Sequence, residues 1–323
     1  MASQRDQERA SGIVGESVAM RAICDRILQM TTIECPVLLR GEPGTGKMLV
    51  ARTIHANSGR ANKAFVRMHC AAMPDMVLDA GVFEGTTGPI TSSPLDAYII
   101  RADGGTLFLD EVTDLGPQTQ DRLLTVAREG VLHWHGRTTR VNVRLIAWSS
   151  RDLEDGVACG RFRRDFYEHL SVVTLAVPPL RERKADLPAL LQVLVERFAR
   201  EHARRVDRLS RRANEMVMNY DWPGNVRELS DVVERAVVVA NGPVIHHHHL
   251  PPAVQAAAPA GSEAPIGLIE AIDAYEKELL QDALRQARGV RSKAARLLRT
   301  TDRIFNYKLR KHGIDSTQFK VSG

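Results

Sequence analysis

The strongest chemical motif in the chain is a glycine-rich loop that ends in a lysine. Residues 41–47 read Gly-Glu-Pro-Gly-Thr-Gly-Lys and match the spacing GxxxxGK. The apolar run Val37–Leu39 precedes the loop and a helical pattern follows it, which is the strand–loop–helix context that this motif requires. Glycines let backbone N–H groups turn inward around phosphates, and the N-terminus of the following helix adds its positive dipole end. We therefore predict a nucleotide-phosphate site formed by Gly41, Glu42, Pro43, Gly44, Thr45, Gly46, Lys47 and Met48.

Two adjacent carboxylates supply a second set of reactive groups. The apolar run Thr106–Leu109 ends in Asp110 and Glu111, and in a P-loop protein such a strand ends beside the phosphates. There Asp110 would hold Mg²⁺, through water if needed, and Glu111 would orient and activate the attacking water. Met48 replaces the Ser or Thr whose hydroxyl usually contacts Mg²⁺. We therefore predict ATP and Mg²⁺ as the ligands of this site.

A basic segment near the C-terminus indicates a polyanion as a second partner. The whole chain carries a formal net charge of only +5, but ten basic residues lie between positions 285 and 311 against a single acid. The stretch Ser292–Leu298 reads as a short helix capped by Ser292, and Asp302–His312 as a second helix capped by Thr301. A short helix, a tight turn and a basic second helix predict a helix-turn-helix that binds double-stranded DNA.

The second helix of this motif would enter the major groove with its N-terminal residues at the base edges. Leu297, Leu298, Ile304 and Leu309 are expected in the core of the motif. The alternative interpretation of the segment is a solvated pair of basic helices. We expect base contacts from Asp302, Arg303 and Asn306 and phosphate contacts from Lys308, Arg310 and Lys311, with Ser292, Lys293 and Thr301 completing the DNA-binding set.

Five short apolar runs must position the nucleotide site. Each is rich in Val, Ile, Leu or Phe and continuous rather than alternating, which is typical of strands buried on both faces. Amphipathic stretches such as Val18–Met30 and Lys47–Asn57 separate them. Strands that alternate with helices predict an α/β fold with a mainly parallel sheet. The runs are Pro36–Arg40, Phe65–Met68, Thr106–Leu109, Arg144–Trp148 and Val172–Val177.

The 323 residues are long enough for more than one domain. No apolar run approaches the roughly 20 residues of a membrane span, and the four cysteines are scattered. These features exclude membrane, secreted and disordered classes and favour a reduced cytoplasm. Trp148 is expected in the core.

We predict an α/β nucleotide-binding core at 12–177, a helical lid at 178–250, an Ala- and Pro-rich linker at 251–265 and an all-α helix-turn-helix domain at 266–315.

Five blocks, in order along the chain, resemble the sigma-54-dependent enhancer-binding activators. The resemblance spans about residues 12–314. It implies a P-loop AAA+ ATPase of the bacterial cytoplasm whose rings hold nucleotide between subunits and remodel a stalled RNA polymerase with sigma-54. The basic segment resembles the Fis-type helix-turn-helix of the same activators. The blocks are Gly41–Lys47, Gly104–Glu111, Gly160–Arg163, Pro178–Arg183 and Trp222–Leu229.

The resemblance also implies roles for single residues. Arg227 looks like the sensor arginine of the lid, and Arg163 looks like a catalytic finger that reaches into the neighbouring subunit's site. Ile13 and Val14 would lie near the adenine. The polymerase-contacting loop of the family corresponds to Gly88, Pro89, Ile90, Thr91, Ser92 and Ser93.

Several positions depart from the family's pattern, among them Ser92 in place of the second glycine of the polymerase-contacting loop. Ile90 replaces the exposed phenylalanine of the polymerase-contacting loop, so the apolar anchor of a partner contact is lost. His69 replaces an asparagine that gates the catalytic glutamate, and Ser150 replaces a sensor asparagine. His169 stands where a second finger arginine is expected. Because a histidine is mostly neutral near pH 7, one positive charge that stabilises the transition state would be missing. In related nucleotide hydrolases, such an arginine finger raises the hydrolysis rate by about three to five orders of magnitude.

Two functions follow from this combination. In the first, the protein is a DNA-binding regulator that binds ATP but whose ATP-driven remodelling step is impaired. In the second, it is a fully active ATP-hydrolysing activator of sigma-54 transcription. Both imply a homo-oligomer or a mixed ring with a relative, and the helix at Leu268–Ala287 is expected to pair two DNA-reading heads. No sensory domain is expected before the AAA+ core, since the chain begins almost at the first helix of that core.

Overall fold

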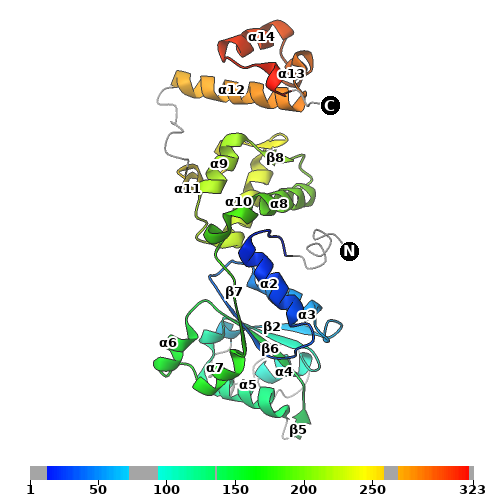
Figure 1. Cartoon of the computed structure of the whole chain (residues 1–323), viewed down its shortest axis with the longest axis vertical. Helices are drawn as coiled ribbons and strands as arrows, with labels where there is room; N and C mark the ends of the chain where they lie inside the picture. Colours follow the sequence, from blue (N-terminus) through cyan, green and yellow to red (C-terminus); the bar gives the residue numbers. More distant parts are fainter. Residues whose placement is uncertain (1–12, 73–93, 135–136, 258–267, 320–323) are drawn as a thin grey trace. The chain divides into compact units, whose positions relative to one another are not determined.

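Figure 1 shows the computed structural model of the chain, in which residues 13–72, 94–134, 137–257 and 268–319 are described. The chain divides into two compact units. The first comprises residues 1–207 and 220–239, and the second comprises residues 208–219 and 240–323. The predicted polymerase-contacting loop at 88–93 lies outside the described residues.

The first unit is built on a five-stranded sheet with the order β2-β3-β6-β1-β7, in which every neighbouring pair is parallel. Each strand lies within one of the five apolar runs or extends it by a single residue. The predicted α/β fold with a parallel sheet is therefore confirmed. The strands are β1 (Val37–Arg40), β2 (Phe65–His69), β3 (Thr106–Asp110), β6 (Arg144–Ser149) and β7 (Val173–Ala176).

Helices cover both faces of this sheet. Val37 and Leu39 of β1 pack into one core with α2 and α3, whereas Leu38 between them packs into the other core with α5 and α7. Successive residues of a strand point to opposite faces, so the continuous apolar run is buried on both sides. The helices of this unit are α2 (Val18–Gln29), α3 (Lys47–Ala56), η1 (Cys70–Ala72), α4 (Pro94–Arg101), η3 (Val112–Asp114), α5 (Pro117–Glu129), α6 (Leu153–Ala158), α7 (Arg164–Leu170), η4 (Leu180–Asp186), α8 (Leu187–Glu201) and α10 (Asn225–Val239).

The apolar pattern does not predict one element of the first unit. Strand β4 (Val131–Trp134) pairs antiparallel with β5 (Arg137–Arg140) to form a hairpin. The sequence of β5 is Arg-Thr-Thr-Arg, which contains no apolar residue whose alternation could mark a strand.

The second unit begins with the short parallel strands β8 (Arg208–Leu209) and β9 (Val244–Ile245) and with α9 (Arg211–Asn219). They are followed by η5 (His247–His249) and α11 (Pro252–Gln255). Val254 of α11 is buried, so the first residues of the predicted linker 251–265 are helical. The other domain boundaries drawn from the sequence stay predictions.

The second unit ends in the three helices of a helix-turn-helix and a short 3-10 helix. They are α12 (Leu268–Gln286), α13 (Arg291–Leu297), α14 (Asp302–Lys311) and η6 (Ser316–Phe319). Thr301 caps α14 as predicted, because its hydroxyl accepts a hydrogen bond from the backbone N–H of Ile304 at 3.3 Å. The predicted cap at Ser292 is wrong, since α13 begins at Arg291 and Val290, two residues before Ser292, takes the N-cap position.

The core of these three helices also differs from the prediction. Leu309 is buried as expected, but Leu297 and Ile304 are 47% and 51% exposed. Phe305 is completely buried in their place.

In the part of the chain that the structure describes, none of the helices combines the length and the apolar character that a bilayer crossing needs.

Candidate functional site

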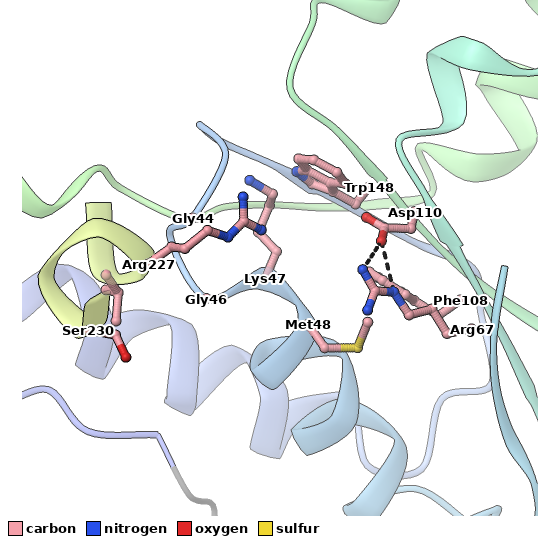
Figure 2. A pocket seen from close by; sticks show the side chains of 11 residues that line it. Gly44, Gly46, Lys47, Met48, Arg67, Phe108, Asp110, Trp148, Arg227 and Ser230 are labelled. Atoms are coloured by element: carbon pink, nitrogen blue, oxygen red, sulfur yellow. Dashed lines mark hydrogen bonds and ion pairs between the residues drawn. The ribbon is translucent and has the colours of Figure 1, made fainter. Parts of the chain in front are cut away.

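A pocket lies in the first unit where the glycine-rich loop, strands β2, β3 and β6 and helix α10 meet. Figure 2 shows Lys47, Arg67 and Arg227 reaching it from three different elements. Asp110 is the one carboxylate among its lining residues. Three cationic side chains line the pocket beside this carboxylate, which favours an anionic ligand. The rest of the lining is Gly44, Gly46, Met48, Phe108, Trp148, Val226 and Ser230.

Two positions of the loop require glycine. Gly44 and Gly46 adopt φ angles of +80° and +99°, and Gly46 is the N-cap of α3. A Cβ atom at Gly44 would lie 2.2 Å from the carbonyl oxygen of Gly224. The loop therefore packs directly on the backbone that leads into α10, and its amides lie at the N-terminus of α3, as a phosphate loop needs.

Lys47 is only 6% exposed although its side chain can carry a charge. Its Nζ donates to the carbonyl oxygens of Gly41, at 2.8 Å, and of Glu42, and it lies 4.2 Å from the centre of the Trp148 ring. Burial is the main cause that lowers the pKa of Lys47 to about 8. The lysine predicted to reach the phosphates is therefore a poorly solvated cation held in place by its own loop.

Two side chains of the edge strand β2 hold Asp110. The Nε of Arg67 donates to Oδ2 of Asp110 at 2.8 Å, and a second nitrogen of the same guanidinium contacts the same oxygen (Figure 2). The Nδ1 of His69 lies 3.0 Å from that oxygen as well. The parallel register of β2 and β3 places His69 directly opposite Asp110. The predicted Mg²⁺ ligand thus already has two cationic or hydrogen-bonding neighbours.

Glu111 follows β3 with a φ angle of +61°. The backbone N–H of Ser150 lies 3.0 Å from both carboxylate oxygens of Glu111, and the hydroxyl of Thr113 donates to Oε1 at 2.7 Å. Ser150, which replaces the family's sensor asparagine, therefore contacts the predicted water-activating carboxylate through its backbone. The catalytic roles of Glu111 and Asp110 stay predictions.

Polar contacts fasten the phosphate loop to the lid segments of the same unit. Arg181 donates to Oε2 of Glu42 at 2.8 Å, and the buried Asn225 donates to the same oxygen at 3.0 Å. These two donors hold the pKa of Glu42 at about 2. The buried Arg183 donates to the carbonyl oxygen of Thr45 at 2.7 Å. Glu42 and Thr45 therefore connect the loop to η4 and α10, whose Arg227 lines the pocket.

Other predicted residues lie away from the pocket lining. Ile13 is buried in the core with α2 and α3, and Val14 beside it is half-buried. Arg163, at the N-cap of α7, pairs with Asp165 at 2.8 Å. His169 is half-buried on α7, where burial, and then a neighbouring arginine, lower its pKa. The lowered pKa favours the neutral form of His169 at pH 7, and its place as the position of a second finger stays a prediction.

Sequence reasoning missed Arg67 and underestimated Trp148 as pocket residues. Trp148 packs partly on the core, as predicted, but it also lines the pocket. The signal for Arg67 was present in the alternation of β2, where Val66 and Met68 are buried and Arg67 and His69 are not. Only the pairing of β2 with β3 shows that this polar face reaches Asp110.

Helix α14 is the candidate DNA-reading element of the second unit. Asp302, Arg303 and Arg310 are exposed on it, and in the described part of this domain neither arginine has an ion-pair partner. Tyr307 is 64% exposed, so an aromatic side chain joins Ile304 on the solvent side of the helix. The predicted core position Ile304 therefore lies on the candidate DNA surface.

The predicted phosphate contacts Lys308 and Lys311 are paired within the domain. Lys311 Nζ lies 2.6 Å from Oδ1 of Asp273, and Lys308 contacts Glu276. His312 Nε2 lies 2.8 Å from Oε2 of Glu276. Both acids belong to α12, so these cations fix α14 to α12 and are less available to DNA than Arg303 and Arg310.

Comparison with known families covers nearly the whole chain. The sigma-54 interaction domain matches residues 13–176, the AAA+ ATPase lid domain matches residues 181–265, and the Fis family of bacterial regulatory proteins matches residues 271–312. The transcriptional regulatory protein ZraR of Klebsiella oxytoca is 40% identical over 306 residues, which are 92% of this chain and 68% of ZraR. The nitrogen fixation protein AnfA of Azotobacter vinelandii is 37% identical over 319 residues, which are 98% of this chain and 60% of AnfA.

Solved structures with a similar fold include NtrX from Brucella abortus. The NtrX crystal structure in complex with ADP has a TM-score of 0.66 and 28% sequence identity, and the match covers 96% of this chain and 72% of the NtrX chain. The NtrX structure in complex with ATP has a TM-score of 0.65, with coverage of 94% and 69%.

Proposed function

Because the chain belongs to the sigma-54 interaction domain family, we propose that it is a sequence-specific DNA-binding transcriptional regulator that binds ATP and whose ATP-driven remodelling step is weakened. It acts on double-stranded DNA in the bacterial cytoplasm, through α14. Its oligomer is a ring of identical subunits or a mixed ring with a relative. The exposed Ile272 and Tyr275 of α12 support pairing of two DNA-reading domains.

The observation that best supports the proposed nucleotide binding is the positive charge of the pocket lining. Lys47, Arg67 and Arg227 line it around one carboxylate, at the N-terminus of α3, and Lys47 is buried. NtrX, which shares the fold, was crystallised with ADP and with ATP. Glu42 accepts a hydrogen bond from Asn225 of α10, the helix that carries Arg227, so a nucleotide in this pocket would contact loop and lid together.

Two sites support the proposal that the ATP-driven remodelling step is weakened. His169 is neutral at pH 7 where the family resemblance places an arginine finger, and such a finger contributes about three to five decades of rate in related hydrolases. Asp110, the expected Mg²⁺ ligand, is paired with Arg67 and His69. Contact with RNA polymerase and sigma-54 would use the loop at 88–93, whose Ile90 replaces a phenylalanine.

A fully active ATP-hydrolysing activator that remodels the sigma-54 holoenzyme is the second candidate. It is favoured by the presence of Lys47, Asp110, Glu111 and the finger residue Arg163 in one chain. Arg163 is exposed at the start of α7, as a residue that serves a neighbouring subunit must be.

ATP turnover by the purified chain across a concentration series separates the two candidates, with ATP affinity measured on the same samples. Lys47→Ala is the blank, because it removes the buried cation of the loop. The proposal predicts ATP binding that Lys47→Ala weakens by about 100-fold, with turnover of the unchanged chain close to that of the blank at every concentration. Turnover that rises cooperatively with concentration and vanishes in Lys47→Ala would contradict it and establish the active motor.

A further inference from the structure

The carboxylate that should bind a metal ion faces a guanidinium. Arg67 and Asp110 are both lining residues of the nucleotide pocket, and both interactions of Arg67 are with Oδ2 of Asp110. His69 Nδ1 approaches the same oxygen at 3.0 Å. Asp110 is largely buried, whereas nearly half of the Arg67 side chain is exposed. One side of the guanidinium is therefore paired, and part of the group remains accessible to a ligand.

The position of Arg67 follows from the sheet and not from a flexible loop. Arg67 and His69 alternate with the buried Val66 and Met68, so both side chains lie on one face of β2. In the register of β2 with β3, Arg67 is opposite Phe108 and His69 is opposite Asp110. Figure 2 shows the Arg67 guanidinium between its strand and Asp110, on the pocket side. The strand pairing thus fixes a cation beside the phosphate loop.

The residues of the pocket do not fit a protein-held Mg²⁺ ion. Mg²⁺ is bound by oxygen ligands, usually one or two carboxylates together with the substrate phosphates, and it retains several waters. Asp110 is the one carboxylate in the lining, its Oδ2 is taken, and Met48 offers no hydroxyl. A divalent cation on Asp110 would also lie next to the positive charge of Arg67, and like charges at such a distance repel.

The same pocket is rich in groups that bind phosphate oxygens directly. Lys47, Arg67 and Arg227 supply cationic donors from the loop, β2 and α10. A terminal phosphate carries about −1.5 to −2 charges at pH 7 and several acceptor oxygens, which these donors can satisfy. A guanidinium is well suited to this, because its planar fork binds phosphate oxygens in pairs.

We propose that Arg67 takes the place of the metal ion in this pocket, so that the nucleotide binds through its terminal phosphates to Arg67 without needing Mg²⁺. Asp110, which His69 also contacts, positions the guanidinium, and Arg67 bridges Asp110 and the phosphate. The inference rests on the proposed binding of ATP and adds how the triphosphate is neutralised. It also explains how a subunit can hold ATP while the metal-dependent step is weakened.

Titration calorimetry of the full chain with ATP, in buffer with Mg²⁺ and in buffer with EDTA, tests the inference. We compare the unchanged chain with Arg67→Ala, with Arg67→Lys, and with Arg21→Ala, a control that removes an exposed arginine of α2. We expect the dissociation constant of the unchanged chain to differ by less than about threefold between the two buffers. In EDTA, Arg67→Ala should weaken ATP binding by about tenfold to a hundredfold, as loss of a charged hydrogen bond does.

The two remaining variants make the result specific. Arg67→Lys keeps the positive charge and should recover part of the affinity in EDTA, while Arg21→Ala should match the unchanged chain. Thermal unfolding of each variant checks that it is folded. The inference is overturned if the unchanged chain loses tenfold or more in EDTA and Arg67→Ala binds ATP as the unchanged chain does. Binding that is absent in both buffers would instead overturn the proposed ATP site itself, and the inference with it.

Discussion

The nucleotide pocket and helix α14 both present cations for phosphate, but they do so in different physical settings. Lys47 is buried, contacts carbonyl oxygens of its own loop, and has a pKa of about 8. Arg303 and Arg310 are exposed to solvent on α14. Charges interact strongly where water is excluded and weakly where water and salt screen them. A single pocket residue should therefore outweigh a single residue of the DNA surface.

Removal of the buried cation is the largest effect that this comparison predicts. Lys47→Ala should weaken ATP binding by about 100-fold, because a charged hydrogen-bond donor is lost in a desolvated site. DNA binding of the same variant to its operator should remain unchanged. Calorimetry with ATP and a DNA mobility assay measure the two quantities, and a Lys47→Ala chain that still binds ATP well would show that the pocket is not the phosphate site.

Loss of an exposed arginine near the start of α14 should have the next largest effect. Arg303→Ala should cost about 2 kcal/mol, or about thirtyfold, in binding to the specific operator, and should relax base specificity. ATP affinity should not change. Binding to a set of operator variants measures this, and an unchanged preference at every base would contradict a reading role for Arg303.

The two regions should also differ in their response to pH. The pKa of the unliganded Lys47 is lowered to about 8, and the anionic phosphates bind its protonated form. Protonation is nearly complete at pH 7 and small at pH 9, so ATP affinity should fall by about tenfold over this range. DNA affinity should stay level, because arginine keeps its proton at these pH values. ATP affinity that is constant between pH 7 and pH 9 would contradict the lowered pKa.

Within α14, the smallest effects should come from the paired lysines. Lys311 is bound to Asp273, so Lys311→Ala should weaken DNA binding by less than about twofold. Arg310→Ala should weaken it by about threefold and lower the salt dependence of binding by about one phosphate contact. Measurement of DNA affinity at several salt concentrations compares the two variants, and a larger loss for Lys311→Ala would reverse the assignment.

The sequence predicts local features of this molecule well because local patterns determine them. The glycine spacing of the loop, the apolar strands and the cap at Thr301 depend on residues that are neighbours in the chain. The pairing of Arg67 with Asp110 depends on strands that only the folded sheet brings together. The spacing of apolar residues alone therefore gave no sign that the expected Mg²⁺ ligand has a cationic neighbour.

Helix α14 shows a second limit of sequence-based prediction. Ile304 and Phe305 are both apolar and adjacent, and one residue corresponds to a large rotation about a helix axis. The packing on α12 and α13 selects Phe305 for the core and leaves Ile304 exposed. The pairing of Lys308 with Glu276 is likewise a contact between helices that are distant in the chain.

The central claim is that the motor is weakened while nucleotide binding is retained, and His169→Arg tests it most directly. ATP turnover is measured at high protein concentration for the unchanged chain, for His169→Arg and for Arg163→Ala. The account predicts that His169→Arg restores a finger charge and raises turnover by at least about tenfold, with ATP affinity unchanged and Arg163→Ala at or below the original rate. A rapid turnover by the unchanged chain that His169→Arg does not increase would contradict the account and identify a fully active ATPase.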